Sequence, residues 1–304
     1  MKKFIIAIFI FTLFLGVSSV EAKTKATPRQ KSQIQQFSEQ HRNIKEIKNF
    51  IKKHNEVANS HDLEKLSNFY AENYINSDGF KKEPYLEVIK KTWEVSDKIK
   101  YKTKILSTEV NGNRAVVYTY ETAQAQIVEK TRAGNLVGDL YSTSRGYYYL
   151  EKINNSWFIS GESILDEESK LFYGNAKDVK IDFYTPKQVY QGDSYIAGLN
   201  VHAGKDNFVI ASIDQDKISH PSITPEAKFR PLNDNELERF IIANKDNANE
   251  YVVASLVISK VKEATKEENM RVYVSGLACL MKKVNVVPKN NLINETEKDE
   301  SNGL

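Results

Sequence analysis

Residues 99–123, IKYKTKILSTEVNGNRAVVYTYETA, decide the fold class because side chains of two kinds alternate along them. Residues 99–105 alternate lysines with apolar or β-branched side chains, as expected of a strand that has one covered and one solvent-facing side. The Asn111-Gly112 dipeptide is a strong hairpin signal, and residues 114–123 alternate again. This stretch therefore predicts two antiparallel strands joined by a tight turn.

Two more strand-like runs follow. A glycine-containing loop precedes residues 140–152, and Asn154-Asn155-Ser156 turns the chain into residues 157–164. The spacing predicts a meander of long antiparallel strands.

Before residue 99 the sequence has the period of a helix. Apolar side chains recur at three- and four-residue steps along residues 44–58, and the lysines lie outside this stripe. Shorter apolar stripes follow at residues 63–70 and 84–93, with Ser60 or Asp62 as a cap for the second helix and Pro84 as the first residue of the third. Helices followed by antiparallel strands predict an α+β layer, with helices covering one face of a curved sheet.

The order of these elements resembles the nuclear transport factor two-like superfamily, which includes SnoaL-like and ketosteroid-isomerase-like proteins. The residues that carry the resemblance are His61-Asp62-Leu63, the segment 74–79, and Asn155-Ser156-Trp157-Phe158-Ile159. It covers about residues 42–170. The resemblance implies a cone of helices on a curved antiparallel sheet, with a cavity that often holds an apolar ligand.

The resemblance also implies which residues would serve that cavity. The candidates for ligand contact are aromatic: Tyr74, Trp93, Tyr101, Tyr120 and Tyr147. In isomerase relatives a carboxylate removes a proton beside a carbonyl, and a tyrosine holds the resulting oxyanion. Asp78 stands at a roughly corresponding position, and Tyr101 or Tyr118 could supply the phenol. The Asn-Ser-Asp-Gly turn explains Asp78 equally well without catalysis.

Other polar residues favour structural roles. His54 lies at the edge of the first apolar stripe, and His61 stands in a turn without a second histidine at zinc-ligand spacing. Glu121 points either into the cavity or away from it, and the alternation leaves both directions open. We expect neither a metal nor a cofactor.

The second half predicts a different architecture. Short strand-like runs at turn-marked intervals over residues 178–288 predict an all-β sandwich, separated from the first domain (residues 42–174) by a short linker. Residues 185–192, TPKQVYQG, resemble the opening of immunoglobulin-like bacterial modules. Residues 246–250 form an oxygen-rich turn without a calcium-loop pattern, so a hairpin is favoured.

The first 22 residues predict export. Lys2 and Lys3 precede an apolar run of roughly 14 residues, shorter than the about 20 that span a membrane, and small residues follow at 20 and 22. The single cysteine, Cys279, is remote from this segment, which argues against a lipid anchor, and its apolar surroundings predict a buried thiol. We expect a soluble periplasmic or extracellular protein without a membrane span after cleavage, a flexible arm over residues 23–41, and a disordered tail over 289–304.

The sequence is compatible with three functional hypotheses. A net charge of +3 with 27% charged residues gives no reason to expect a nucleic-acid partner. The leading hypothesis is an exported, non-catalytic binding protein whose first domain holds a small apolar ligand or a protein partner. The second is an isomerase or dehydratase with Asp78 as general base, and the third is a structural adaptor that forms a homodimer through open sheet faces. Whether the protein is an enzyme stays uncertain, with binding favoured over catalysis.

Overall fold

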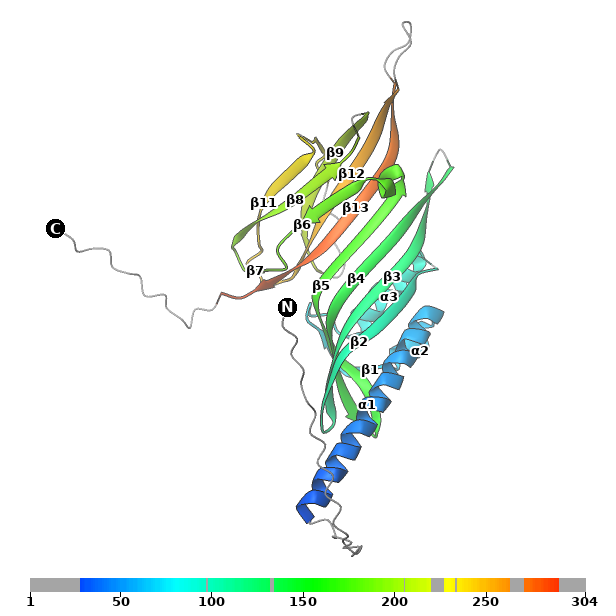
Figure 1. Cartoon of the computed structure of the whole chain (residues 1–304), viewed down its shortest axis with the longest axis vertical. Helices are drawn as coiled ribbons and strands as arrows, with labels where there is room; N and C mark the ends of the chain where they lie inside the picture. The colour runs from blue at the N-terminus through cyan, green and yellow to red at the C-terminus, as the bar shows by residue number, and fades with distance from the viewer. Residues whose placement is uncertain are drawn as a thin grey trace, which may run out of the picture. The chain divides into compact units, whose positions relative to one another are not determined.

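The structure is a computed structural model that describes residues 28–96, 98–131, 134–204, 206–219, 227–232, 234–262 and 271–289. The predicted signal peptide and the predicted tail after residue 289 lie outside these ranges. The chain divides into two compact units, residues 1–42 and 43–304. The first contains the beginning of helix α1, and the second contains all the elements that follow it (Figure 1).

Helix α1 (Pro28–Ser60) begins within the segment that the sequence predicts to be a flexible arm. The prediction is wrong for residues 28–41, because the Gln, Lys and Glu residues of this segment are good helix formers and Pro28 suits a first helical position. Residues 23–27 lie outside the described ranges. In the part of the chain that the structure describes, no helix has the length and apolarity needed to cross a membrane.

Two shorter helices and a strand follow. Asp62 caps α2 (Leu63–Ser67) by accepting a hydrogen bond from the Lys65 backbone N–H at 3.0 Å. Strand β1 (Tyr70–Asn76) was not predicted, because Tyr70 and Tyr74 are four residues apart, as on a helix. Helix α3 (Lys82–Val95) starts two residues before Pro84.

The meander that the sequence predicts is confirmed, with strands longer than expected. The strands are β2 (Lys100–Asn111), β3 (Arg114–Thr131), β4 (Gly134–Ile153) and β5 (Ser156–Gly174), all antiparallel neighbours. β1 pairs with β5 in parallel. Asn154 and Asn155 both have positive φ, 48° and 68°, which matches the twist of the β4–β5 hairpin.

The second half adds a short helix and eight strands. They are η1 (Asn175–Asp178), β6 (Lys180–Tyr184), β7 (Gln188–Tyr190), β8 (Ser194–His202), β9 (Asn207–Lys217), β10 (Arg230–Pro231), β11 (Glu236–Ile242), β12 (Glu250–Lys262) and β13 (Arg271–Val287). β13 pairs with β5, so one sheet runs in the order β10-β9-β12-β13-β5-β4-β3-β2 (Figure 1). A separate three-stranded sheet has the order β11-β8-β6.

The helices and the small sheet cover opposite faces of the long sheet. Leu140 of β4 packs into the core beneath the helices and pairs with Leu171 of β5. The next residue, Phe172, packs into the core of the small sheet and pairs with Ala278 of β13, which belongs to the same core. Because successive side chains on a strand point to opposite faces, the helices and the small sheet pack on opposite faces of the long sheet.

The predicted boundary between domains falls in η1, but the sheet continues past it through the β5–β13 pairing. Two facing sheets form the broad sandwich that the sequence predicts for the second half. One of these layers is an extension of the first half's sheet, whereas neither sheet of an immunoglobulin-like module is shared with another domain. The immunoglobulin-like topology is therefore not established.

We predict that Gly276→Ala weakens the junction between β5 and β13. Gly276 pairs with Gly174, and a Cβ on Gly276 would lie 2.5 Å from the backbone nitrogen of Ala176. Relieving this overlap should lower the free energy of unfolding by about 1–3 kcal/mol, measured by urea denaturation. Gly204→Ala is the control, because its Cβ would meet no atom closer than 3.5 Å; equal midpoints for the two variants would contradict the prediction.

Candidate functional site

A polar cluster lies between the helices and the sheet, at the centre of the first half. Glu121 of β3 accepts a hydrogen bond from the Tyr148 hydroxyl at 2.8 Å, and Glu162 of β5 accepts one from the Tyr85 hydroxyl at 2.8 Å. The structure therefore settles the direction of Glu121, which points toward the helices. Glu162 was missed at the sequence level.

The charge states of this cluster follow from its burial. Burial, opposed by the hydrogen bond from Tyr85 and assisted by the nearby Glu121 carboxylate, raises the pKa of Glu162 to about 8. Burial also raises the pKa of Glu121. His54, whose Nε2 lies 3.0 Å from the Tyr70 hydroxyl, has its pKa lowered to about 4 by burial and is neutral at physiological pH.

Little space remains inside the cluster. The cavity bordered by Tyr85, Glu121, Tyr148 and Glu162 has a volume of about 60 Å³. A few water molecules fill such a volume, and a substrate with a ring system does not fit. In this structure the carboxylates form a polar core among tyrosine side chains.

We predict that Glu162 makes stability depend on pH. Its raised folded-state pKa means that its stabilising contribution is fully present below its ordinary pKa of 4.5 and is lost as the pH rises through about 8. Glu162→Gln keeps the shape and removes the titration. Between about pH 5 and about pH 9, the melting temperature of the wild type should fall by several degrees relative to that of Glu162→Gln, as followed by scanning fluorimetry.

The control is Glu109→Gln, because Glu109 lies on the exposed side of β2. Its melting profile against pH should run parallel to that of the wild type. Parallel profiles for Glu162→Gln would show that Glu162 does not titrate between the folded and unfolded states as described.

Three of the aromatic residues expected to serve the cavity lie on the helix face. Trp93 donates its indole N–H to the Tyr101 hydroxyl at 3.2 Å, and the His61 ring stacks on Trp93 with ring centroids 4.9 Å apart. Tyr74 is buried with ring contacts to Tyr70 and Tyr85. These side chains fill the space between helices and sheet as part of the apolar core.

Tyr118, Tyr120 and Tyr147 point to the opposite face of the sheet. Tyr118 and Tyr147 follow and precede residues of the helix-side core, and their rings pack together with centroids 5.0 Å apart. The Arg145 guanidinium lies over the Tyr120 ring at 5.7 Å. Tyr147 also borders the 60 Å³ cavity. The sequence could not choose between the two faces, because both contain aromatic side chains.

Asp78 forms a buried ion pair and makes no hydrogen bond to Glu121 or Glu162. Each of its carboxylate oxygens accepts a hydrogen bond from the Lys283 ammonium at 2.8 Å, and one also accepts from the Asn249 amide at 2.7 Å. The Asp78 and Lys283 side chains are 7% and 0% exposed. Asp78 thereby joins the loop before α3 to β13.

We predict that Lys283→Ala destabilises the fold strongly. The substitution leaves the Asp78 carboxylate buried without its cation, so the free energy of unfolding should fall by about 3–5 kcal/mol in urea denaturation. Lys282→Ala is the matched control, because the neighbouring Lys282 is partly exposed and pairs with Glu168 at 3.8 Å. Its loss should cost less than about 1 kcal/mol; a similar cost for both variants would contradict the role given to the buried pair.

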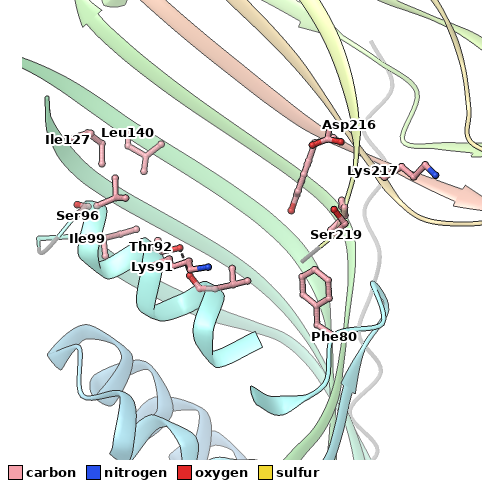
Figure 2. Close-up of a pocket in the computed structure, with 14 residues that line it drawn as sticks. Phe80, Lys91, Thr92, Ser96, Ile99, Ile127, Leu140, Asp216, Lys217 and Ser219 are labelled. Atoms are coloured by element: carbon pink, nitrogen blue, oxygen red, sulfur yellow. Dashed lines mark hydrogen bonds between the residues drawn. The ribbon is translucent and has the colours of Figure 1, made fainter. Parts of the chain in front are cut away.

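An apolar groove of about 590 Å³ lies beside α3. Side chains from α3, the strands β3 and β4, and the end of β9 converge on it (Figure 2). It is lined by Phe80, Val88, Lys91, Thr92, Val95, Ser96, Ile99, Ile127, Leu140, Asp216, Lys217, Ile218, Ser219 and Tyr251. We refer to these residues as the α3 groove.

The two lysines of the α3 groove form ion pairs at its margin. Lys91 pairs with Glu87 at 3.1 Å, and Lys217 pairs with Asp246. The Tyr251 hydroxyl donates a hydrogen bond to the Glu167 carboxylate at 3.0 Å. Sequence reasoning missed the groove because its lining comes from segments that are far apart in the chain, each of which looks like an ordinary amphipathic element.

The oxygen-rich turn at residues 246–250 and Cys279 both have structural roles. The Asn244 side-chain oxygen accepts from the backbone N–H groups of Asp246 and Ala248, so this segment is a hydrogen-bonded turn that ends in the buried Glu250. Cys279 is half-buried, and burial raises its pKa, which disfavours the thiolate. Among the residues that the structure describes, no three His, Cys, Asp or Glu side chains gather as a metal site would require.

Comparison with known proteins gives structural neighbours over part of the chain. No protein-family model matches the sequence, and no curated protein is similar to it. The solved neighbours include a hexachlorocyclohexane dehydrochlorinase (12% identity, 40% of this chain and 83% of that one, TM-score 0.33). They also include a conserved protein from Planctomyces limnophilus, with 14% identity over 40% of this chain and 94% of that one and a TM-score of 0.33. A protein with a cystatin-like fold from Nostoc punctiforme has 14% identity over 46% of this chain and 93% of that one, with a TM-score of 0.28. Similarity of this extent assigns no activity or ligand to this chain.

Proposed function

We propose that the protein is a non-catalytic binding protein that holds a small apolar ligand in the α3 groove. The observation that carries the proposal is the groove itself, which has a volume of about 590 Å³ and half of whose lining residues are Val, Ile, Leu or Phe. Small-molecule sites usually have volumes of about 300–1,000 Å³ and combine apolar walls with a few polar groups. The α3 groove has both properties.

The chemistry of the groove favours binding over catalysis. Both lysines at its margin are held in ion pairs, and the Tyr251 hydroxyl donates a hydrogen bond to Glu167. The carboxylates that are suited to proton transfer, Glu121 and Glu162, lie in the 60 Å³ cavity, which is too small for a ring-containing substrate. Asp78, the general base of the competing hypothesis, has its oxygens occupied by Lys283 and Asn249.

The energetics of such a site are modest. A ligand that buries about 200 Å² of apolar surface gains about 5 kcal/mol from the hydrophobic effect, and association consumes part of this gain. Because a net binding free energy of about 4 kcal/mol corresponds to a dissociation constant of about 1 mM, we expect dissociation constants in the millimolar range. The apolar leader at residues 4–17 supports the further proposal that the protein works after export.

Filling the groove should abolish binding. Val88 lies on the groove side of α3, and Val88→Trp introduces an indole into the space that the ligand needs. Fluorescence titration with N-phenyl-1-naphthylamine, an uncharged apolar probe, should show at least tenfold weaker binding by this variant than by the wild type.

The matched control is Val137→Trp, because Val137 is 48% exposed on β4 and does not line the groove. It should bind the probe as the wild type does, and melting temperatures of both variants establish that they fold. Equal binding by Val88→Trp, or no binding by the wild type, would overturn the proposal. Native mass spectrometry that finds a stoichiometric protein partner and no small molecule would favour a partner surface instead.

A further inference from the structure

One polar group in the α3 groove is buried without a partner. Ser96, which follows the last residue of α3, is 3% exposed, and its hydroxyl has no hydrogen-bond partner among the described residues. Its backbone is satisfied, since the N–H donates to the Thr92 carbonyl at 3.0 Å and the carbonyl accepts from the Ile99 N–H at 3.5 Å. Among the polar groups of Ser96, the side-chain hydroxyl is the one without a hydrogen-bond partner among the described residues.

The described residues around Ser96 give its hydroxyl no hydrogen-bond partner. Apolar side chains of Ile99, Ile127 and Leu140 lie on the same side of the groove (Figure 2). A buried hydroxyl that makes no hydrogen bond costs free energy, and an alanine here would avoid that cost. Thr92, one turn earlier, offers the contrast: it also lines the groove, but its hydroxyl donates to the Val88 carbonyl at 3.0 Å.

The electrostatics near Ser96 disfavour an anion. The C-terminal end of a helix carries partial negative charge, so a carboxylate placed beside the end of α3 would be repelled. The lysines of the groove, Lys91 and Lys217, are already paired with Glu87 and Asp246. A neutral group that donates or accepts one hydrogen bond suits this position.

From these contacts we infer that the ligand of the α3 groove is an uncharged apolar molecule with a single oxygen-bearing group, an alcohol or a ketone, which hydrogen-bonds to the Ser96 hydroxyl. This inference rests on the proposed binding function and specifies the chemical class of the ligand. Ser96 is then the residue that selects among apolar molecules, while the walls of the groove supply the affinity.

The test compares three probes with the same ring system: naphthalene, naphthol and naphthoate. Equilibrium dialysis against the full chain should show naphthol binding about three- to tenfold more tightly than naphthalene, as one hydrogen bond provides. Naphthoate should bind more weakly than naphthol. Ser96→Ala should reduce naphthol affinity to that of naphthalene without lowering the melting temperature.

The control variant is Ser212→Ala, which removes another buried hydroxyl without a hydrogen-bond partner among the described residues, at a position outside the α3 groove. It should keep the preference for naphthol. Equal affinities of the wild type for naphthol and naphthalene, a preference that survives Ser96→Ala, or tightest binding of naphthoate would each overturn the inference while leaving the groove as a binding site. Failure of all three probes to bind the wild type would reject the binding function itself, and the inference with it.

Discussion

Hydrogen bonding between β5 and β13 is the constraint on which the rest of the fold depends. These strands pair over Glu168–Gly174 and Gly276–Lys282, and through them the meander of the first half and the strands of the second half become one sheet. A sheet cannot end at an open edge in the middle of an apolar surface without exposing unpaired backbone groups. The pairing removes that edge from both halves at once.

The shared sheet also explains why a groove exists. The helices cover one face of the sheet over β2–β5, and the small sheet covers the other face over β9, β12 and β13. Where α3 ends, Ile127 and Leu140 of the helix-covered face line the α3 groove together with residues at the end of β9. The buried pair of Asp78 and Lys283 fixes the loop before α3 against β13 and so sets the position of one wall.

The sequence predicts the strands and helices well where periodicity is strong, and the site poorly. The alternation at residues 99–123 and the turn at Asn154-Asn155 identify the meander correctly. Glu162 could not be placed, because the pairing of β4 with β5 shifts register between Tyr149 and Leu150. Ile159 and Glu162, three residues apart, thus both face the helices, where strict alternation would separate them. The sequence also could not identify Lys283 as the partner of Asp78, because Lys283 is distant in the chain and resembles a solvent-exposed lysine on a strand.

The β5–β13 pairing has a consequence for how the chain is made. Leu171 pairs with Cys279, so this edge of β5 stays unpaired during synthesis until β13, much later in the chain, has been made. Contacts of such large sequence separation slow folding, and an exposed strand edge is a template for association with other chains. The nascent first half is therefore at greatest risk of aggregation before β13 emerges, and a factor that shields the edge of β5 during that interval would determine the yield of native protein.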